Sequence, residues 1–230
     1  MEQIIELFKN KNGLEVGGLS RMFCEGAAIP LYPVINDLDG CNFSSKTLWE
    51  DGLKEGRNYN FFKNKFGYQY ICEATEISHR MPVNKYDFII SSNCLEHIAN
   101  PLKAISQYLS VLKIGGILLL ALPKKEVTFD HKRPVTSYEH LYEDFENDIK
   151  EDDLSHLEEI LIYHDLVLGP PAGNIHQFKE RSLKNFENRG LHQHIFDDKL
   201  LLQIFNSFNI DTLFQKDIGS DYIIVGRRDV

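Results

Sequence analysis

The chain has 230 residues, 43% of them hydrophobic and 26% charged, which suits a single α/β domain over residues 1–230 with a substantial core. Its net charge of -9 argues against a nucleic-acid partner, because non-specific affinity for phosphates comes from lysine and arginine. No apolar run approaches the ~20 residues that span a bilayer, and residues 1–13 lack the apolar core of a signal peptide. The cysteines are scattered without a C-x-x-C pair, so we expect reduced thiols in a cytoplasmic protein with no membrane partner.

The first predicted elements are a short helix and a strand that ends in glycines. Residues 2–9 place Ile4, Ile5 and Phe8 on one side of a helix that would pack over the sheet. Residues 13–18 read GLEVGG, a strand followed by a turn. A glycine-rich turn lets backbone N–H groups approach a ligand that a β-carbon would hold away. This turn is therefore a candidate ligand contact, with a plain tight turn as the alternative.

A short crossover separates this turn from the second predicted strand, residues 32–38. Residues 19–32 leave room only for a stunted helix. The second strand ends in Asp37 and Asp39, and Asp39 follows Gly17 by about 20 residues. A carboxylate at that interval can accept hydrogen bonds from both hydroxyls of a ribose. We therefore assign ribose binding to Asp39, with Asp37 on the same face and a solvated turn acid as alternatives.

Residues 42–64 read as a polar and aromatic connection to the third predicted strand, residues 68–72. The connection contains the only tryptophan, Trp49, whose ring could cover a purine or roof the core. We favour the roof. Glu73, Ala74 and Thr75 follow the third strand, where small side chains could let a flat base lie close; an ordinary strand-to-helix turn is the alternative.

The centre of the chain, residues 86–123, reads as a strand, a helix and a strand. Its two apolar runs, residues 88–91 and 117–122, are typical of strands buried on both faces. Between them, apolar side chains recur at helical spacing and stop at a Gly-Gly pair: Ile98, Leu102, Ile105, Leu109 and Leu112. Such a unit is almost always parallel and right-handed, so ligands should bind at the carboxyl end of its first strand. The side chains expected at that end are Ser91, Ser92, Asn93, Glu96 and His97.

About seventy residues, 124–196, separate the fifth predicted strand from the next helix, which is too long for a plain loop. Helical spacing recurs three times within this segment, with Ser137 as one N-cap. We expect a helical insertion that acts as a substrate lid. After it, Asp197 caps the last helix, and residues 209–225 read as a closing antiparallel hairpin.

Histidine titrates near neutral pH, and most of the histidines lie in the insertion. His131 follows the fifth strand, while His192 and His194 precede the last helix; His97 ends the fourth strand. We take His97, His131 and His194 as candidate general bases, a role worth about 10²- to 10⁴-fold in rate. The alternative for each is a helix cap or a surface residue. Imidazoles at 131, 192 and 194 with an aspartate could bind a metal, but the spacing matches no short motif and we predict none.

The segment NCLEH, followed by NPL, an amphipathic helix and LKIGGILLLALP, resembles the second half of the class I S-adenosylmethionine-dependent methyltransferases. The resemblance covers nearly the whole chain apart from the insertion. It implies a Rossmann-like α/β fold, with a mostly parallel sheet and a closing hairpin, and S-adenosylmethionine as the cofactor. The family's E-x-G-x-G-x-G signature falls at Glu15 and Gly17, with Gly18 one position early. The expected cofactor contacts are Glu15, Gly17, Gly18, Asp39, Glu73, Ala74, Thr75, Ser92 and Asn93.

The leading functional hypothesis is methyl transfer from S-adenosylmethionine to a small or carbohydrate-like acceptor, on oxygen. A second hypothesis is a degenerate methyltransferase fold that acts as a binding or scaffolding module, because the glycine signature is incomplete. A third is a nicotinamide-dependent oxidoreductase, since such enzymes also bind a nucleoside through a glycine turn and an acidic residue. The G-x-G-x-x-G spacing that it requires is absent from the sequence.

Overall fold

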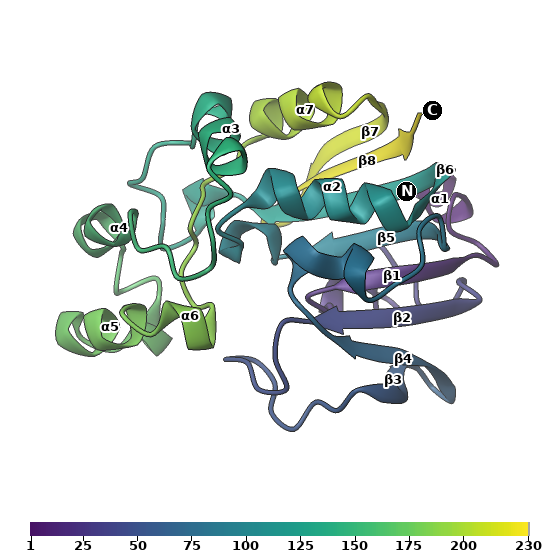
Figure 1. Cartoon of the computed structure of the whole chain (residues 1–230), viewed down its shortest axis with the longest axis horizontal. Coiled ribbons are helices and arrows are strands. Elements are labelled where there is room, and N and C mark those ends of the chain that lie inside the picture. Colours follow the sequence, from purple (N-terminus) through teal and green to yellow (C-terminus); the bar gives the residue numbers. More distant parts are fainter. Residues whose placement is uncertain (230) are drawn as a thin grey trace.

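The chain forms one twisted sheet covered by helices, and the computed structural model describes residues 1–229 (Figure 1). The strands are β1 (Asn12–Val16), β2 (Asp37–Asn42), β3 (Gly56–Phe62), β4 (Lys65–Ile71), β5 (Tyr86–Ser92), β6 (Leu112–Pro123), β7 (Ile210–Ile218) and β8 (Asp221–Arg228). The α-helices are α1 (Glu2–Glu6), α2 (Pro101–Val111), α3 (Tyr138–Glu146), α4 (Leu157–Tyr163), α5 (Ile175–Ser182), α6 (Asn185–Asn188) and α7 (Asp198–Ser207). The strand order across the sheet is β3-β4-β2-β1-β5-β6-β8-β7.

The centre of the sheet is parallel and its edges are antiparallel. β4, β2, β1, β5 and β6 run parallel, while β8 pairs antiparallel with β6 and with β7. The predicted α/β fold and its closing hairpin are therefore confirmed. β3 lies within residues 42–64, where the sequence predicts only a connection, and it pairs antiparallel with β4. Only Tyr59 and Phe61 of β3 are buried, so GRNYNFF lacks the apolar run that marks the central strands.

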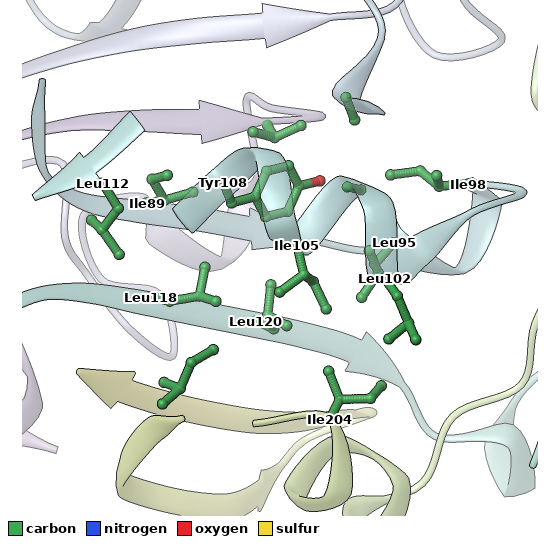
Figure 2. Close-up of a cluster of buried hydrophobic side chains, with 14 of the residues drawn as sticks. Ile89, Leu95, Ile98, Leu102, Ile105, Tyr108, Leu112, Leu118, Leu120 and Ile204 are labelled. Carbon is green, nitrogen blue, oxygen red and sulfur yellow. The ribbon is translucent and has the colours of Figure 1, made fainter. Parts of the chain in front are cut away.

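Side chains of β6 alternate between two hydrophobic clusters, one on each face of the sheet. Leu118 and Leu120 belong to the cluster that includes α2 and α7. Ile117 and Leu119 belong to the cluster that includes α1. Figure 2 shows Leu118 and Leu120 close to Ile105 of α2 in the first cluster. Burial on both faces explains why the two central strands read as unbroken apolar runs.

α2 begins later than the apolar spacing predicts. Asn100 is its N-cap and accepts a hydrogen bond from the backbone N–H of Lys103 at 3.1 Å, while Pro101 occupies the first turn. Residues Leu95–His97 instead form a single 3₁₀ turn between β5 and the helix. His97 therefore lies just beyond the carboxyl end of β5.

The second strand lies further along the chain than predicted. Tyr32 and Ile35 are fully buried, but they belong to turns that pack against the sheet. β2 starts only at Asp37 and ends at Asn42, and Asp39 pairs with Leu14 of β1. Before it, the crossover contains a single 3₁₀ turn, so the predicted stunted helix is confirmed.

The segment between β6 and α7 contains α3 to α6, which lie beside the carboxyl ends of the parallel strands (Figure 1). The predicted caps are confirmed: Ser137 accepts from the N–H of His140 at the start of α3, and Asp197 accepts from the N–H of Leu200 in α7. A small separate core holds this segment together: Ile160, Ala172, Phe178 and Leu191. Within residues 1–229, no helix is long and apolar enough to cross a membrane.

Removal of the Ile105 side chain should destabilise the sheet–helix layer. Ile105→Ala leaves a cavity in the first cluster, so we expect the free energy of unfolding to fall by about 2–5 kcal/mol in urea denaturation. Ile114→Ala, at a side chain 58% exposed, is the control and should change it by less than about 0.5 kcal/mol. Equal losses in the two variants would contradict this description of the core.

Candidate functional site

A cavity of about 550 Å³ opens at the carboxyl ends of β1, β2, β4 and β5. This volume is typical of pockets for small molecules and cofactors. Its wall is formed by the strand tips, residues 47–50 of the connection before β3, and two residues from the segment between β6 and α7. The lining residues include Val16 to Arg21, Cys41 to Phe43, Thr47, Trp49, Glu50, Cys72 to Ala74, Ser92 to Cys94, His97, Ile98, Glu151 and Arg189.

The glycine turn after β1 lines the cavity as expected. Gly17 has a φ of +79°, and a β-carbon there would come within 2.5 Å of the Cys94 sulfur. Both the conformation and the space therefore require glycine. Gly18 also lines the cavity, and its carbonyl accepts a hydrogen bond from the Asn42 side chain at 3.2 Å.

Glu15 does not line the cavity, so its expected contact with the cofactor is wrong. Its carboxylate is buried behind the turn and accepts hydrogen bonds from the hydroxyls of Tyr32 and Tyr59 and from the N–H of Ser20. Burial raises the pKa of the Glu15 carboxyl to about 7, although these hydrogen bonds oppose the shift. Glu15 therefore supports the turn from behind.

Asp39 is also absent from the cavity wall, which corrects its assignment to the ribose. It lies in the first half of β2, and its carboxylate accepts from Lys85 at 2.7 Å, from Tyr86 at 2.8 Å and from the N–H of Tyr68 at 2.8 Å. The tip of β2 carries Asn42 instead. The alternative Asp37 begins the same strand and lies further still from the tip.

At the tip of β4, Glu73 and Ala74 line the cavity, while Thr75 does not. The Glu73 carboxylate accepts a 2.6 Å hydrogen bond from Arg189, whose guanidinium also lies 3.4 Å from Glu151. Burial raises the pKa of Glu73 despite Arg189, and burial raises the pKa of Glu151 to about 7. Glu151 and Arg189, which are far from Glu73 in the sequence, thus close this corner of the cavity.

Trp49 covers the cavity and does not roof the core, which corrects the preferred interpretation. Its side chain is 61% exposed, and its ring stands edge-on to that of His97 with centroids 5.0 Å apart. Glu50, beside it, also lines the cavity, and burial raises the pKa of its carboxyl. Among the acids of the wall within residues 1–229, Glu50 alone has a carboxylate that makes no hydrogen bond or ion pair, since Glu73 and Glu151 both contact Arg189.

His97 is the one candidate base that reaches the cavity, close to Ser92 and Asn93. Its Nδ1 lies 2.9 Å from the carbonyl oxygen of Leu191 and so donates to it, which leaves a lone pair on Nε2. Burial, with the nearby His192, lowers the pKa of His97 to about 3. The imidazole is therefore neutral at physiological pH.

The other two candidate bases lie elsewhere. His131 pairs with Asp165 at 3.0 Å, and neither residue lines the cavity. His194 is 1% exposed and belongs to a cluster within the helical segment. The metal set suggested by the sequence does not come together among the described residues, because His131 pairs with Asp165, His192 pairs with Asp130 and His194 lies in a separate cluster.

Four residues that shape the site are not expected from the sequence: Asn42, Glu50, Glu151 and Arg189. Glu96, beside His97, is expected at the end of the fourth predicted strand and lies there. The other residues carry no local signal, because their approach to the cavity depends on the true end of β2 and on the path of long connections.

A family model described as a methyltransferase domain matches residues 2–212. The match covers most of the chain, so the chain belongs to the methyltransferase-domain family. The protein is an S-adenosylmethionine-dependent methyltransferase of class I. No curated protein sequence matches the chain at a significant level.

Solved structures share the fold. An S-adenosylmethionine-dependent methyltransferase from Mesorhizobium loti has a TM-score of 0.55 at 9% identity, over 99% of this chain and 95% of that one. A methyltransferase from Methanosarcina mazei has a TM-score of 0.50 at 11% identity, over 99% and 97%. At such identities the similarity shows the fold alone.

The cavity wall fits S-adenosylmethionine. Gly17 opens the backbone to close approach at one end, and the small Ala74 leaves room for a flat base at the other. Glu50 and Glu73 are carboxylate acceptors for hydroxyl and amine donors, and Arg21 is a cation for a carboxylate. The family cofactor and the residue types present therefore agree.

Asp39→Asn should separate a structural role from a role in ribose binding. Lys85 and Tyr86 lose their anionic partner, so we expect the free energy of unfolding to fall by about 1–2 kcal/mol in urea denaturation. The dissociation constant for S-adenosylhomocysteine, measured by calorimetry, should stay unchanged. Weaker binding of S-adenosylhomocysteine at an unchanged free energy of unfolding would instead support ribose binding by Asp39.

Proposed function

We propose that the protein transfers a methyl group to a hydroxyl of a small, carbohydrate-like acceptor. The observation that carries this proposal is the pair formed by His97 in the cavity wall and the buried carboxylate of Glu96 behind it. A hydroxyl must lose its proton as it attacks a methyl group, whereas a neutral amine attacks with a free lone pair. A proton acceptor beside the cavity therefore favours oxygen as the methylated atom.

The strand order suggests which part of the cavity faces each end of the cofactor. With the base against Ala74 at β4, the ribose would lie near β2 and the amino-acid end near Gly17 at β1. The reacting end would then face the tip of β5, where Asn93 and His97 follow. When bound, S-adenosylmethionine supplies an electrophilic methyl group on a sulfonium. Holding the acceptor hydroxyl in line with that group is the main task of the wall.

Glu50 takes the ribose-binding role that Asp39 cannot perform. It lines the cavity, it is half-buried, and its carboxylate oxygens have no competing cation among the described residues of the wall. A carboxylate can accept hydrogen bonds from two adjacent hydroxyls at once. The tip of β2 supplies the Asn42 amide at this place, and that amide is already bonded to Gly18 and Gln69.

His97 and Glu96 act together on the acceptor hydroxyl. Nε2 of His97 keeps a lone pair that can accept a hydrogen bond from an acceptor hydroxyl, and it lies 3.9 Å from Oε1 of Glu96. His97 would orient the hydroxyl, and Glu96, the stronger base, would take its proton as the methyl group is transferred to oxygen and the sulfur leaves as a neutral thioether. Burial raises the pKa of the Glu96 carboxyl to about 7, and both its oxygens lack a hydrogen-bond partner among residues 1–229.

The acceptor is small and ring-shaped in this proposal. The exposed Trp49 ring offers an apolar face beside His97, while carboxylates in the wall offer acceptors for hydroxyls. Residues 124–196 act as the lid, since they contribute Glu151 and Arg189 to the wall. The free cysteines support a cytoplasmic location.

Glu50→Gln should weaken the binding of S-adenosylhomocysteine. Loss of a charged acceptor for the ribose hydroxyls costs about 1.5 kcal/mol, so the dissociation constant measured by calorimetry should rise about tenfold. The control Asp51→Asn alters an exposed neighbouring acid and should bind like the wild type. Absence of saturable binding to the wild type would reject the cavity as the cofactor site.

The reaction rate should rise with pH through about 7, because Glu96 accepts the proton only when it is ionised. Glu96→Gln should lower kcat by about 10²- to 10⁴-fold and remove this pH dependence, without weakening S-adenosylhomocysteine binding. Glu187→Gln, at an exposed acid, is the control. The measurement is steady-state kinetics with a panel of hydroxyl acceptors. An unchanged pH profile in Glu96→Gln would refute this role of Glu96, and cofactor binding without turnover would favour a binding module.

A further inference from the structure

A second polar cluster lies outside the cavity, within the helical segment. It contains three histidines and one aspartate, and one donor atom from each residue lies within 4.8 Å of all the others. His140 and Asp144 come from α3, His156 is the N-cap of α4, and His194 precedes α7. Neither the family match nor the proposed methyl transfer uses these side chains.

The spacing of the donor atoms matches ligands around one ion. Nε2 of His140 lies 3.0 Å from Nε2 of His156 and 3.4 Å from Oδ2 of Asp144. Four ligands placed tetrahedrally at zinc distances are separated from one another by about 3.3 Å. A hydrogen bond between two imidazoles explains only the first of these contacts.

Two buried atoms of the cluster have no hydrogen-bond partner within the described part of the chain. They are Oδ2 of Asp144, a residue 9% exposed, and Nδ1 of His194, a residue 1% exposed. A buried carboxylate oxygen or imidazole nitrogen without a partner costs free energy. An ion bound at the centre of the cluster would satisfy the Asp144 oxygen, which lies 3.4 Å from Nε2 of His140 and 3.6 Å from Nε2 of His194.

We propose that His140, Asp144, His156 and His194 bind one divalent transition-metal ion, with Zn²⁺ as the best match. Imidazole and carboxylate are the ligands that zinc prefers beside thiolate. Nε2 of His194 lies 3.6 Å from Oδ2 of Asp144 and 3.1 Å from the carbonyl oxygen of Ala99, so this nitrogen is at the edge of the cluster.

The ion has a structural role, because four protein ligands leave no open position for a substrate. It joins α3, the start of α4 and the chain before α7, which are far apart in sequence. The chain before α7 also provides Leu191, whose carbonyl holds His97, and Arg189 in the cavity wall. Binding of the ion therefore orders one side of the cavity without taking part in the reaction.

The test is metal analysis of the untagged full-length protein by plasma mass spectrometry, followed by chelation and reloading with Zn²⁺ or Co²⁺. We expect about one zinc ion per chain and, with Co²⁺, the strong visible absorption of a tetrahedral site. Chelation should lower the Tm, and Zn²⁺ should restore it. Less than a tenth of an equivalent after reloading, at retained helical circular dichroism, would overturn the proposal.

Variants locate the site. His140→Ala and Asp144→Asn should each weaken zinc binding by at least about tenfold in a competition titration with a chromophoric chelator. Their Tm should also become insensitive to chelation. His176→Ala, at an exposed histidine in α5, is the matched control and should keep the wild-type affinity. Wild-type zinc affinity in both His140→Ala and Asp144→Asn would place the ion elsewhere and refute this site.

Discussion

The buried carboxylate of Glu15 is the contact on which the cavity wall depends. Tyr32, Tyr59 and the N–H of Ser20 all donate to it, so one side chain of β1 joins the crossover, the edge strand β3 and the glycine turn. These donors offset the cost of burying the carboxyl group. Because Glu15 holds the turn from behind, Gly17 keeps the backbone conformation that leaves space for a ligand in front.

The opposite wall depends on the chain that leads into α7. Arg189 bonds to Glu73, the carbonyl of Leu191 orients His97, and the N–H of Gln193 donates to the backbone of Glu96 at 2.7 Å. Residues after β5 and residues about a hundred positions later thus form one unit. The orientation of His97 and the shape of the cavity around Glu73 both depend on how this segment is ordered.

The correction at Asp39 follows from the true position of β2. Asp39 has the right residue type at the right interval, but Tyr32 and Ile35 are buried as turn residues and were read as a strand. That shift moves the end of β2 to Asn42 and turns Asp39 into a partner of Lys85. A local hydrophobic pattern indicates which residues are buried, but it does not determine where a strand begins and ends.

The sequence by itself determined the order of the elements apart from β3, the central strand–helix–strand unit and the glycine turn, because buried runs, helical spacing and glycine act locally. It also indicated a helical segment after β6 and the closing hairpin. Only the tertiary structure decided which side chains meet. Glu50, Arg189 and the four residues of the histidine cluster come together through long connections, whose paths are set by packing between segments far apart in the chain.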